Sequence, residues 1–204
     1  MILKQEIFRK IFHLGLSIIP ILYLHLGKIT FLTTFIPLTI IIIALDFCRC
    51  RYSKFDSLIT PIFKFIMRDK ELKNHQLSGM SWAFFGASLN FIAFDPVFAT
   101  TGFFILIFAD SMGAIVGKSI VSKKFYQKSQ AGSLAFFITA IIVIISCGIY
   151  FDCSLSFYIF AIIVTMLITY LEAYPSLLSL DDNLLIPLTF GICMSLLDLM
   201  WHIL

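Results

Sequence analysis

Charged residues are scarce in this chain. Only 13% of its 204 residues are Asp, Glu, Lys or Arg, whereas 60% are hydrophobic. Soluble domains usually carry about 25% charged residues, so a chain of this composition cannot hide its apolar surface in one soluble core. The formal charge of +3 is small, and a weak basic excess confined to a few loops is typical of membrane orientation rather than nucleic-acid binding. The composition therefore predicts an all-α, polytopic membrane helix bundle.

Several familiar site patterns are also missing. The chain has no G-x-x-x-x-G-K-[ST] segment, which excludes the usual P-loop nucleotide site. Its five cysteines and four histidines have no metal-ligand spacing, so we expect reduced cysteines, no disulfide and no zinc site. No Ser/His/Asp or Cys/His arrangement can be read from the order of residues. These absences leave acidic and basic side chains as the candidates for chemistry.

Long apolar segments recur along the whole chain, and seven are predicted to cross the membrane. The first and third are short for about 30 Å of hydrocarbon and are expected to extend into their flanks. Asp46, at the end of the second, is expected to be solvated. No repeat or long linker divides the segments, so residues 1–204 are interpreted as a single membrane domain. The predicted spans are Ile11–Leu26, Ile29–Phe47, Met80–Phe94, Val97–Val116, Leu134–Phe151, Leu155–Tyr174 and Leu184–Leu204.

Basic residues gather before the first span and in every second connection. By the positive-inside rule, these connections face the cytoplasm, which predicts a cytoplasmic N-terminus and an external C-terminus. The acidic connection between spans six and seven then falls on the cytoplasmic side too. The residues that carry this signal are Lys4, Arg9, Lys10, Arg49, Arg51, Lys54, Lys64, Arg68, Lys70, Lys73, Lys118, Lys123, Lys124 and Lys128.

The long connection between spans two and three has its own pattern. Apolar residues recur there at steps of three and four, which is the stripe of an amphipathic helix. A basic amphipathic helix at this place is expected to lie in the cytoplasmic interface, with Pro61 kinking or dividing it. This helix is interpreted either as a connector that rests on the headgroups or as an element that controls the entry of lipid. The stripe consists of Phe55, Leu58, Ile59, Ile62, Phe63, Ile66 and Met67.

Asp110 is the most informative single residue, because it lies deep in an apolar segment. An acid inside a membrane helix is costly and indicates a functional site by default. Gly113 and Gly117 follow at helical spacing and allow close backbone approach. The lysine-rich stretch Lys118–Lys128 comes next and suggests a phosphate-bearing ligand. The alternative is a buried acid paired with a neighbouring helix, with lysines that only face the headgroups.

The predicted topology brings further charges to the same face. Asp110, Glu172 and Asp182 are candidate oxygen ligands for magnesium or another divalent cation. Lys118 and Lys128 are candidates for binding phosphates that such ions bridge. Asp110, Lys118, Lys128 and Asp182 form the predicted catalytic set, with Asp182 as the general base.

A possible anion site accompanies these charges. Ser129 and Ser133, with free amides around Gly132 at the start of span five, are expected to form a nest at a helix N-terminus. Asn183 adds an amide next to Asp182. Together with the charged residues, this set indicates a site for phosphoryl transfer at a membrane surface.

Five short motifs, in order and over residues 8–187, resemble the polyprenol kinase family of integral membrane enzymes. That family includes dolichol kinase, phytol kinase and the CTP-dependent diacylglycerol kinase. The motifs are R-K-x-x-H at Arg9, Lys10 and His13; R-x-x-E with Ser-Gly at Arg68, Glu71, Ser78 and Gly79; D-x-x-[AG]-x-x-x-G-[KR] at Asp110, Gly113, Gly117 and Lys118; K-S-x-E-G-S at Lys128, Ser129, Gly132 and Ser133; and an acid before D-N-x-x-x-P at Glu172, Asp182, Asn183 and Pro187.

The resemblance implies transfer of the γ-phosphoryl group of a nucleoside triphosphate, typically CTP, to the hydroxyl of an isoprenoid alcohol or diacylglycerol. It also implies a divalent cation and gives the remaining motif residues a role in binding substrate or nucleotide. Ala131 departs from the family's glutamate. The lipid alcohol and the oligomeric state stay open. Two alternatives remain: a CDP-lipid-forming cytidylyltransferase, whose related motif reads K-T-x-E-G, and a non-enzymatic transporter or structural bundle.

Overall fold

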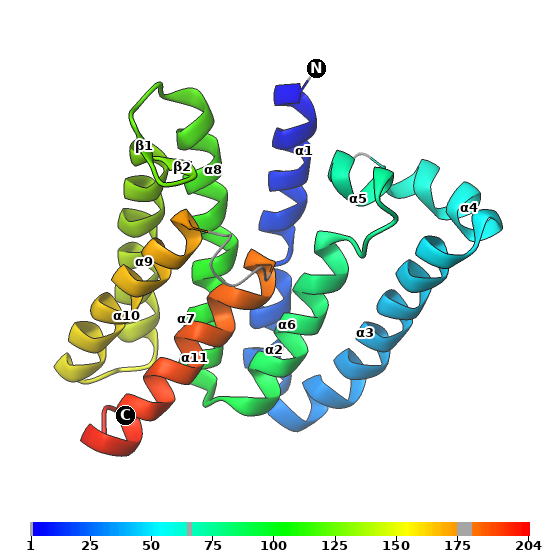
Figure 1. The fold of residues 1–204 in the computed structure, drawn as a ribbon. Helices are drawn as coiled ribbons and strands as arrows, with labels where there is room; N and C mark the ends of the chain where they lie inside the picture. Colours follow the sequence, from blue (N-terminus) through cyan, green and yellow to red (C-terminus); the bar gives the residue numbers. More distant parts are fainter. Residues whose placement is uncertain (1, 65–66, 175–180) are drawn as a thin grey trace. The chain divides into compact units, whose positions relative to one another are not determined.

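The computed structural model describes residues 2–64, 67–174 and 181–204, and these are almost entirely helical (Figure 1). The predicted all-α class is confirmed, because the only strands described are two of two residues each. The chain forms two compact units, Met1–Ser88 and Leu89–Leu204, here termed the N-terminal and C-terminal units. Whether the chain acts as one domain stays a prediction.

Aromatic rings hold the N-terminal unit together. Tyr23 meets Phe31 edge to face with ring centroids 5.3 Å apart, and Phe31 stacks on Phe35 at 4.7 Å. Phe35 in turn stacks on Phe84 at 5.4 Å, so one row of rings joins three helices. The unit's helices are α1 (Ile2–Gly15), α2 (Ile18–Leu26), α3 (Lys28–Arg51), α4 (Ser53–Phe63), α5 (Asp69–Lys73) and most of α6 (Gly79–Ala93).

The C-terminal unit is a helix bundle in which one interrupted rod lies beside three other helices (Figure 1). The rod is α7, η1 and α8, where η1 is a π-helical segment that directly precedes Asp110. Helix α9 packs against η1, α8 and α10, and α11 packs against α7 and α10. The elements are α7 (Pro96–Phe104), η1 (Ile105–Ala109), α8 (Asp110–Ser119), β1 (Lys124–Phe125), β2 (Lys128–Ser129), α9 (Gln130–Tyr150), α10 (Leu155–Ala173) and α11 (Asp182–Trp201).

Polar N-caps start three of these helices. The side chains of Asp95, Ser129 and Asp181 accept hydrogen bonds from backbone amides in the first turns of α7, α9 and α11. Such caps satisfy amides that have no partner within the helix, and each stabilises it by about 1 kcal/mol. Helices α9 and α11 therefore begin at defined residues. The caps fix the positions of the polar side chains in the first turns of these two helices.

Five helical stretches in the described residues are long and apolar enough to cross a membrane: Lys28–Arg51, Pro96–Ser119, Gln130–Tyr150, Leu155–Ala173 and Asp182–Trp201. They match five of the seven predicted spans. The first predicted span is divided between α1 and α2, and the third is the 15-residue α6, about 22 Å long. A total of seven spans stays a prediction, because α1, α2 and α6 are each shorter than a bilayer requires.

The predicted amphipathic helix corresponds to α4, which contains Pro61 and has no buried residue. It ends at Phe63; Met67 of the predicted stripe is buried, and Ile66 lies outside the described residues. Its position in a membrane interface stays a prediction. Asp46 corrects one expectation, because it is only 6% exposed rather than solvated. The side chains of Ser78, Ser81 and Arg49 replace water around it.

Candidate active site

A short hairpin carries Lys128. Strands β1 and β2 pair antiparallel with Phe125 opposite Lys128, and the turn between them begins at Tyr126, whose φ of 54° is left-handed. The Tyr126 ring lies edge to face against Tyr170 and Tyr174, with centroids 5.4 and 5.3 Å away. These rings fix the hairpin beside the C-terminal end of α10.

The same end of α10 provides the partner of Lys128. Lys128 Nζ donates a hydrogen bond to Glu172 Oε1 at 2.5 Å, and the Glu172 side chain is 5% exposed. The Gln127 amide donates to the carbonyl of Ala173 at 3.1 Å, which holds the backbone next to this pair. A lysine and a glutamate 44 residues apart thus form a partly buried ion pair, in which the glutamate is the buried partner.

Two more acids surround this lysine. Burial by itself lowers the pKa of Lys128, but the negative charges of Glu172, Asp182 and Asp110 outweigh it and raise the pKa above its usual value. Asp182 also interacts electrostatically with Asp110 and Glu172. The predicted carboxylates and Lys128 therefore converge from α8, β2, α10 and α11.

The neighbouring Asp181 has a different role. Its Oδ1 accepts hydrogen bonds from the backbone and the side-chain nitrogen of Asn183, at 3.1 and 2.7 Å. Asp181 is thus the N-cap of α11, whereas Asp182 contributes to the field at Lys128. The choice of Asp182 over Asp181 as the site acid stays a prediction.

The acids do not by themselves form a metal cage. Within the described residues, no three His, Cys, Asp or Glu side chains are placed to hold a metal ion. Magnesium usually binds to one or two carboxylates and completes its shell with water and substrate phosphates. Oxygen donors of Asp110 and Asp182 fit that mode, while Glu172 is engaged by Lys128. The magnesium ligand set stays a prediction.

The motif glycines bring α8 and α9 into close contact. A Cβ on Gly132 would lie 2.8 Å from the Gly113 carbonyl oxygen and 3.0 Å from the Gly117 Cα. A Cβ on Gly117 would lie 2.9 Å from Ser129 Oγ. Only glycine fits this contact without a shift of backbone, so these residues position the site through packing.

The backbone amides at the start of α9 donate hydrogen bonds to oxygen atoms of the protein itself. The amide of Gly132 donates to Ser129 Oγ at 3.1 Å, and that of Ala131 donates to Ser122 Oγ at 3.1 Å. The Gln130 amide donates to the carbonyl of Lys123 at 2.9 Å. The expectation of free amides here is therefore wrong, because the cap and the hairpin occupy them.

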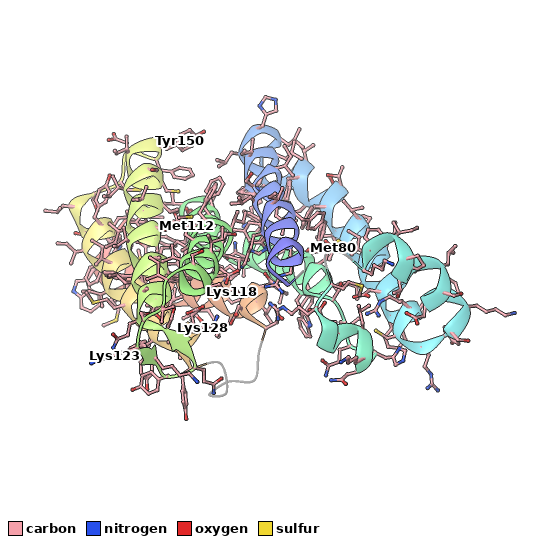
Figure 2. All side chains as sticks on the ribbon, turned by 90° about the horizontal axis from the view of Figure 1, so that it is seen from above. Met80, Met112, Lys118, Lys123, Lys128 and Tyr150 are labelled. Atoms are coloured by element: carbon pink, nitrogen blue, oxygen red, sulfur yellow. The ribbon has the colours of Figure 1, made fainter. Side chains whose placement is uncertain are left out.

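Two other predicted residues lie near this cap or at the end of α8. Ser133 is buried, and its Oγ has no hydrogen-bond partner among the described residues. Lys118 is exposed in the last turn of α8. Figure 2 shows Lys118, Lys123 and Lys128 at the end of the C-terminal unit that carries the hairpin. The predicted role of Lys118 in binding phosphate stays a prediction.

In the N-terminal unit, the arginine and the glutamate of the R-x-x-E motif contact each other. The carboxylate of Glu71, a buried residue, accepts a hydrogen bond from the Arg68 amide at 2.9 Å and lies 3.7 Å from Arg68 Nε. Ser78 donates to Asp46 through both its amide and its hydroxyl, and Gly79 begins α6. These contacts give the motif local structural roles, and its predicted role in substrate binding is untested.

The first motif lies on α1. Arg9 and His13 are half-buried, and Lys10 is 5% exposed. Burial of a lysine is unusual and requires partners for its charge. The predicted roles of these three residues in binding stay predictions.

Sequence reasoning missed two features near these motifs. The π-helical η1 precedes Asp110. Such segments are rare in proteins, and those that occur are often found at functional sites. No residue pattern in the apolar run indicated it. The tyrosine cluster that fixes the hairpin was also missed, although three tyrosines beside a lysine and an acid were a readable signal.

Comparison with known proteins finds a relative that matches this chain over most of both lengths. The chain is 35% identical over 188 residues to an uncharacterised protein of Rickettsia prowazekii, covering 92% of this chain and 91% of that protein. The chain belongs to the same family as this protein. No family profile matches the chain, and no solved structure matches it.

Two relatives with assigned activities are more distant. CTP-dependent diacylglycerol kinase 1 of Saccharomyces cerevisiae is 31% identical over 147 residues, which are 69% of this chain and 50% of the kinase. Its counterpart in Eremothecium gossypii is 28% identical over 156 residues, which are 74% of this chain and 47% of the kinase. The chain spans about half the length of these two kinases, to which it is distantly homologous.

Proposed function

We propose that this chain, as a distant homologue of the CTP-dependent diacylglycerol kinases, is a membrane lipid kinase. It transfers the γ-phosphoryl group of CTP to the hydroxyl of a lipid alcohol, with diacylglycerol as the preferred acceptor. The observation that carries the proposal is the position of Lys128. Its ammonium donates a hydrogen bond to Glu172 and interacts electrostatically with Asp110 and Asp182. Such a cluster provides the cation and the carboxylates that phosphoryl transfer needs.

The charge balance of the cluster explains a need for a divalent cation. Three ionised carboxylates and one ammonium leave a formal charge of −2 around Lys128. An anionic triphosphate would be repelled there unless a cation offset that charge. Magnesium, held by Asp110 and Asp182 together with the phosphates, would supply this neutralisation.

The reaction follows from these roles. The alcohol oxygen forms a bond to the γ-phosphorus while the bond from that phosphorus to the β,γ-bridging oxygen breaks, which releases CDP. Asp182 accepts the alcohol proton. Lys128 and Lys118 stabilise the charge that develops on the phosphates, which can lower the barrier by several kcal/mol.

The proposal places this chemistry at the cytoplasmic face. The hairpin and the N-terminal end of α11 belong to connections assigned to the cytoplasm by the positive-inside rule, where soluble nucleotide is present. The lipid hydroxyl reaches the same surface from the bilayer. The N-terminus is then cytoplasmic and the C-terminus external.

The decisive experiment is product analysis with purified protein. The full chain, in mixed micelles with dioleoylglycerol, Mg²⁺ and CTP labelled at either the α- or the γ-phosphate, should release CDP and transfer only the γ-label to lipid. ATP and a polyprenol serve as the competing donor and acceptor.

The outcomes separate the candidate functions. Pyrophosphate release with α-label in the lipid would identify a cytidylyltransferase instead. Label transfer to polyprenol but not to diacylglycerol would retain the kinase and overturn the acceptor. No transfer to any lipid alcohol, from a protein that remains folded, would contradict the proposal.

A further inference from the structure

A row of aromatic rings begins beside Lys128 in the hairpin and reaches the end of α10. Phe125 pairs directly with Lys128, so the two side chains leave the same face of the hairpin. The Phe125 ring meets Tyr126 edge to face, with centroids 5.1 Å apart. Tyr126 makes the same kind of contact with Tyr170 and Tyr174. The aromatic rings and the lysine among the acids are therefore neighbours in the C-terminal unit.

The ring of Tyr126 is only partly covered by these contacts. The residue is 51% exposed, although it packs against three other rings. It lies in the hairpin loop, between the candidate spans that end at Ser119 and begin at Gln130. Tyrosine combines an apolar ring with a polar tip and is enriched at binding surfaces for that reason. A water-soluble ligand can therefore reach this ring.

The backbone of Tyr126 has a conformation that its residue type disfavours. The strand register leaves Tyr126 and Gln127 as a two-residue loop, and Tyr126 has a φ of 54°. Glycine, asparagine or aspartate is usual at the first position of such a loop, because a bulky side chain is sterically costly in the left-handed region. Residues held in uncommon conformations cluster at ligand sites. The turn alone does not explain why a tyrosine occupies this position.

We propose that Tyr126 stacks on the base of the nucleotide whose phosphates lie at Lys128. The inference rests on the proposed function in taking CTP as the donor. A nucleoside triphosphate has an aromatic base at one end and an anionic chain at the other, and the two side chains that match these ends are two residues apart. Two residues of extended chain span about 7 Å, and the lengths of both side chains add to that separation.

Stacking of this kind positions the nucleotide without selecting cytosine. Every base has a π-face, so an aromatic ring accepts all of them, and each stacked base contributes to affinity. The preference for CTP over ATP must then come from groups other than Tyr126. The ring and the ammonium act on different ends of the ligand, which makes their contributions separable.

Photocrosslinking locates the base without catalysis. The full chain in detergent micelles, with Mg²⁺ and without a lipid alcohol, is irradiated with CTP that carries iodine on the cytosine ring. Such a ring couples to an aromatic side chain that is stacked on it, and labelled peptides are mapped by mass spectrometry. The label should lie on the hairpin peptide that contains Tyr126, and unmodified CTP should compete with it. Labels confined to other peptides would overturn the site.

Variants of Tyr126 separate stacking from a structural role. Tyr126→Leu should weaken CTP binding about tenfold in calorimetry, with ATP affected equally, whereas Tyr126→Phe keeps the ring and should bind as wild type does. Inorganic tripolyphosphate has the phosphates but no base, so its affinity should be the same for Tyr126→Leu and wild type. Tyr126→Gly, with the residue that the loop favours, provides a second variant without the ring.

Tyr150 supplies the matched control. It is 69% exposed and meets Phe151 edge to face at 4.9 Å, so it resembles Tyr126 in exposure and in ring contact. It is the last residue of α9, and Figure 2 shows it at the other end of the C-terminal unit from Lys128. Tyr150→Leu should leave CTP binding unchanged. Melting temperatures check that the variants are folded.

The results distinguish this site from the kinase proposal. Base crosslinking at Tyr126 in a protein that transfers no phosphoryl group to lipid would retain the site and overturn the proposed function. Kinase activity together with unchanged CTP affinity in Tyr126→Leu would overturn the site alone. An equal loss of CTP and tripolyphosphate binding would show that the ring only holds the hairpin, and would overturn stacking.

Discussion

Lys128 Nζ donates a 2.5 Å hydrogen bond to Glu172 Oε1, and this contact joins the hairpin to the C-terminal end of α10. The lysine predicted to bind phosphate is thus held by a protein carboxylate. A bound triphosphate must therefore compete with Glu172 for Lys128, or share it. The pair positions the ammonium among the acids.

The first prediction concerns the role of that ammonium in turnover. Lys128→Ala should lower CTP-dependent phosphorylation of diacylglycerol by about a hundredfold or more, because a preorganised charge is lost from the transferring phosphates. The measurement is γ-label transfer under saturating CTP.

Lys124→Ala is the matched control, since Lys124 lies on the other strand of the same hairpin and is exposed. It should retain nearly full activity. A fully active Lys128→Ala enzyme would remove Lys128 from the mechanism, and equal losses in both variants would indicate damage to the hairpin rather than to catalysis.

The second prediction concerns pH. The pKa of Lys128 is raised above the usual lysine value of 10.5, so its ion pair stabilises the folded chain fully below 10.5. That stabilisation disappears as the pH rises through the folded-state pKa. The difference in melting temperature between wild type and Lys128→Met should therefore stay constant from about pH 7 to about pH 10 and shrink above that. A difference that shrinks near neutral pH would mean that the acids do not hold Lys128 charged.

The sequence predicted the C-terminal cluster because its residues are charged in an apolar background. Asp110, Glu172, Asp182 and Lys128 are each costly in or beside a membrane helix, so their common role could be inferred from order and loop charge. The structure brings them together. The magnesium ligand set and the catalytic roles remain predictions.

The burial of Asp46 and the hydrogen bonds of the amides near Gly132 could not be predicted, because they depend on residues that are not adjacent in the sequence. Asp46 was expected to face water, because a helix end in a basic connection is ordinarily solvated. Its burial comes from Ser78 and Ser81, more than 30 residues away, and from Arg49. The amides near Gly132 were expected to be free, but they are occupied by the cap and by a loop whose path no local pattern shows.

The third prediction tests the close contact of α8 and α9. Gly132→Ala should destabilise the protein by about 1–3 kcal/mol, because its Cβ would meet backbone atoms of Gly113 and Gly117 that cannot easily move. Gly15→Ala is the control, since a Cβ there meets nothing within 4 Å. Thermal unfolding in detergent measures both. Similar melting temperatures for the two variants would show that the helices can separate without cost.

The fourth prediction concerns orientation. Reporters fused after Lys73 and Lys124 should give cytoplasmic signals, and one after Asp152 an external signal, because basic connections stay inside. An external signal at Lys124 would place the hairpin away from soluble nucleotide and would contradict the proposed active-site face.

The fifth prediction tests the buried charges of the N-terminal unit. Asp46→Asn keeps the shape of the side chain but removes the charge that Arg49 faces at 2.7 Å. Because Arg49 is 1% exposed, its charge would then be buried with little compensation, and the free energy of unfolding should fall by about 3 kcal/mol or more. Asp152→Asn, at an exposed left-handed position that asparagine tolerates, should change it little. Denaturant unfolding followed by tryptophan fluorescence measures both, and equal stability of the two variants would mean that the cluster around Asp46 is open to water.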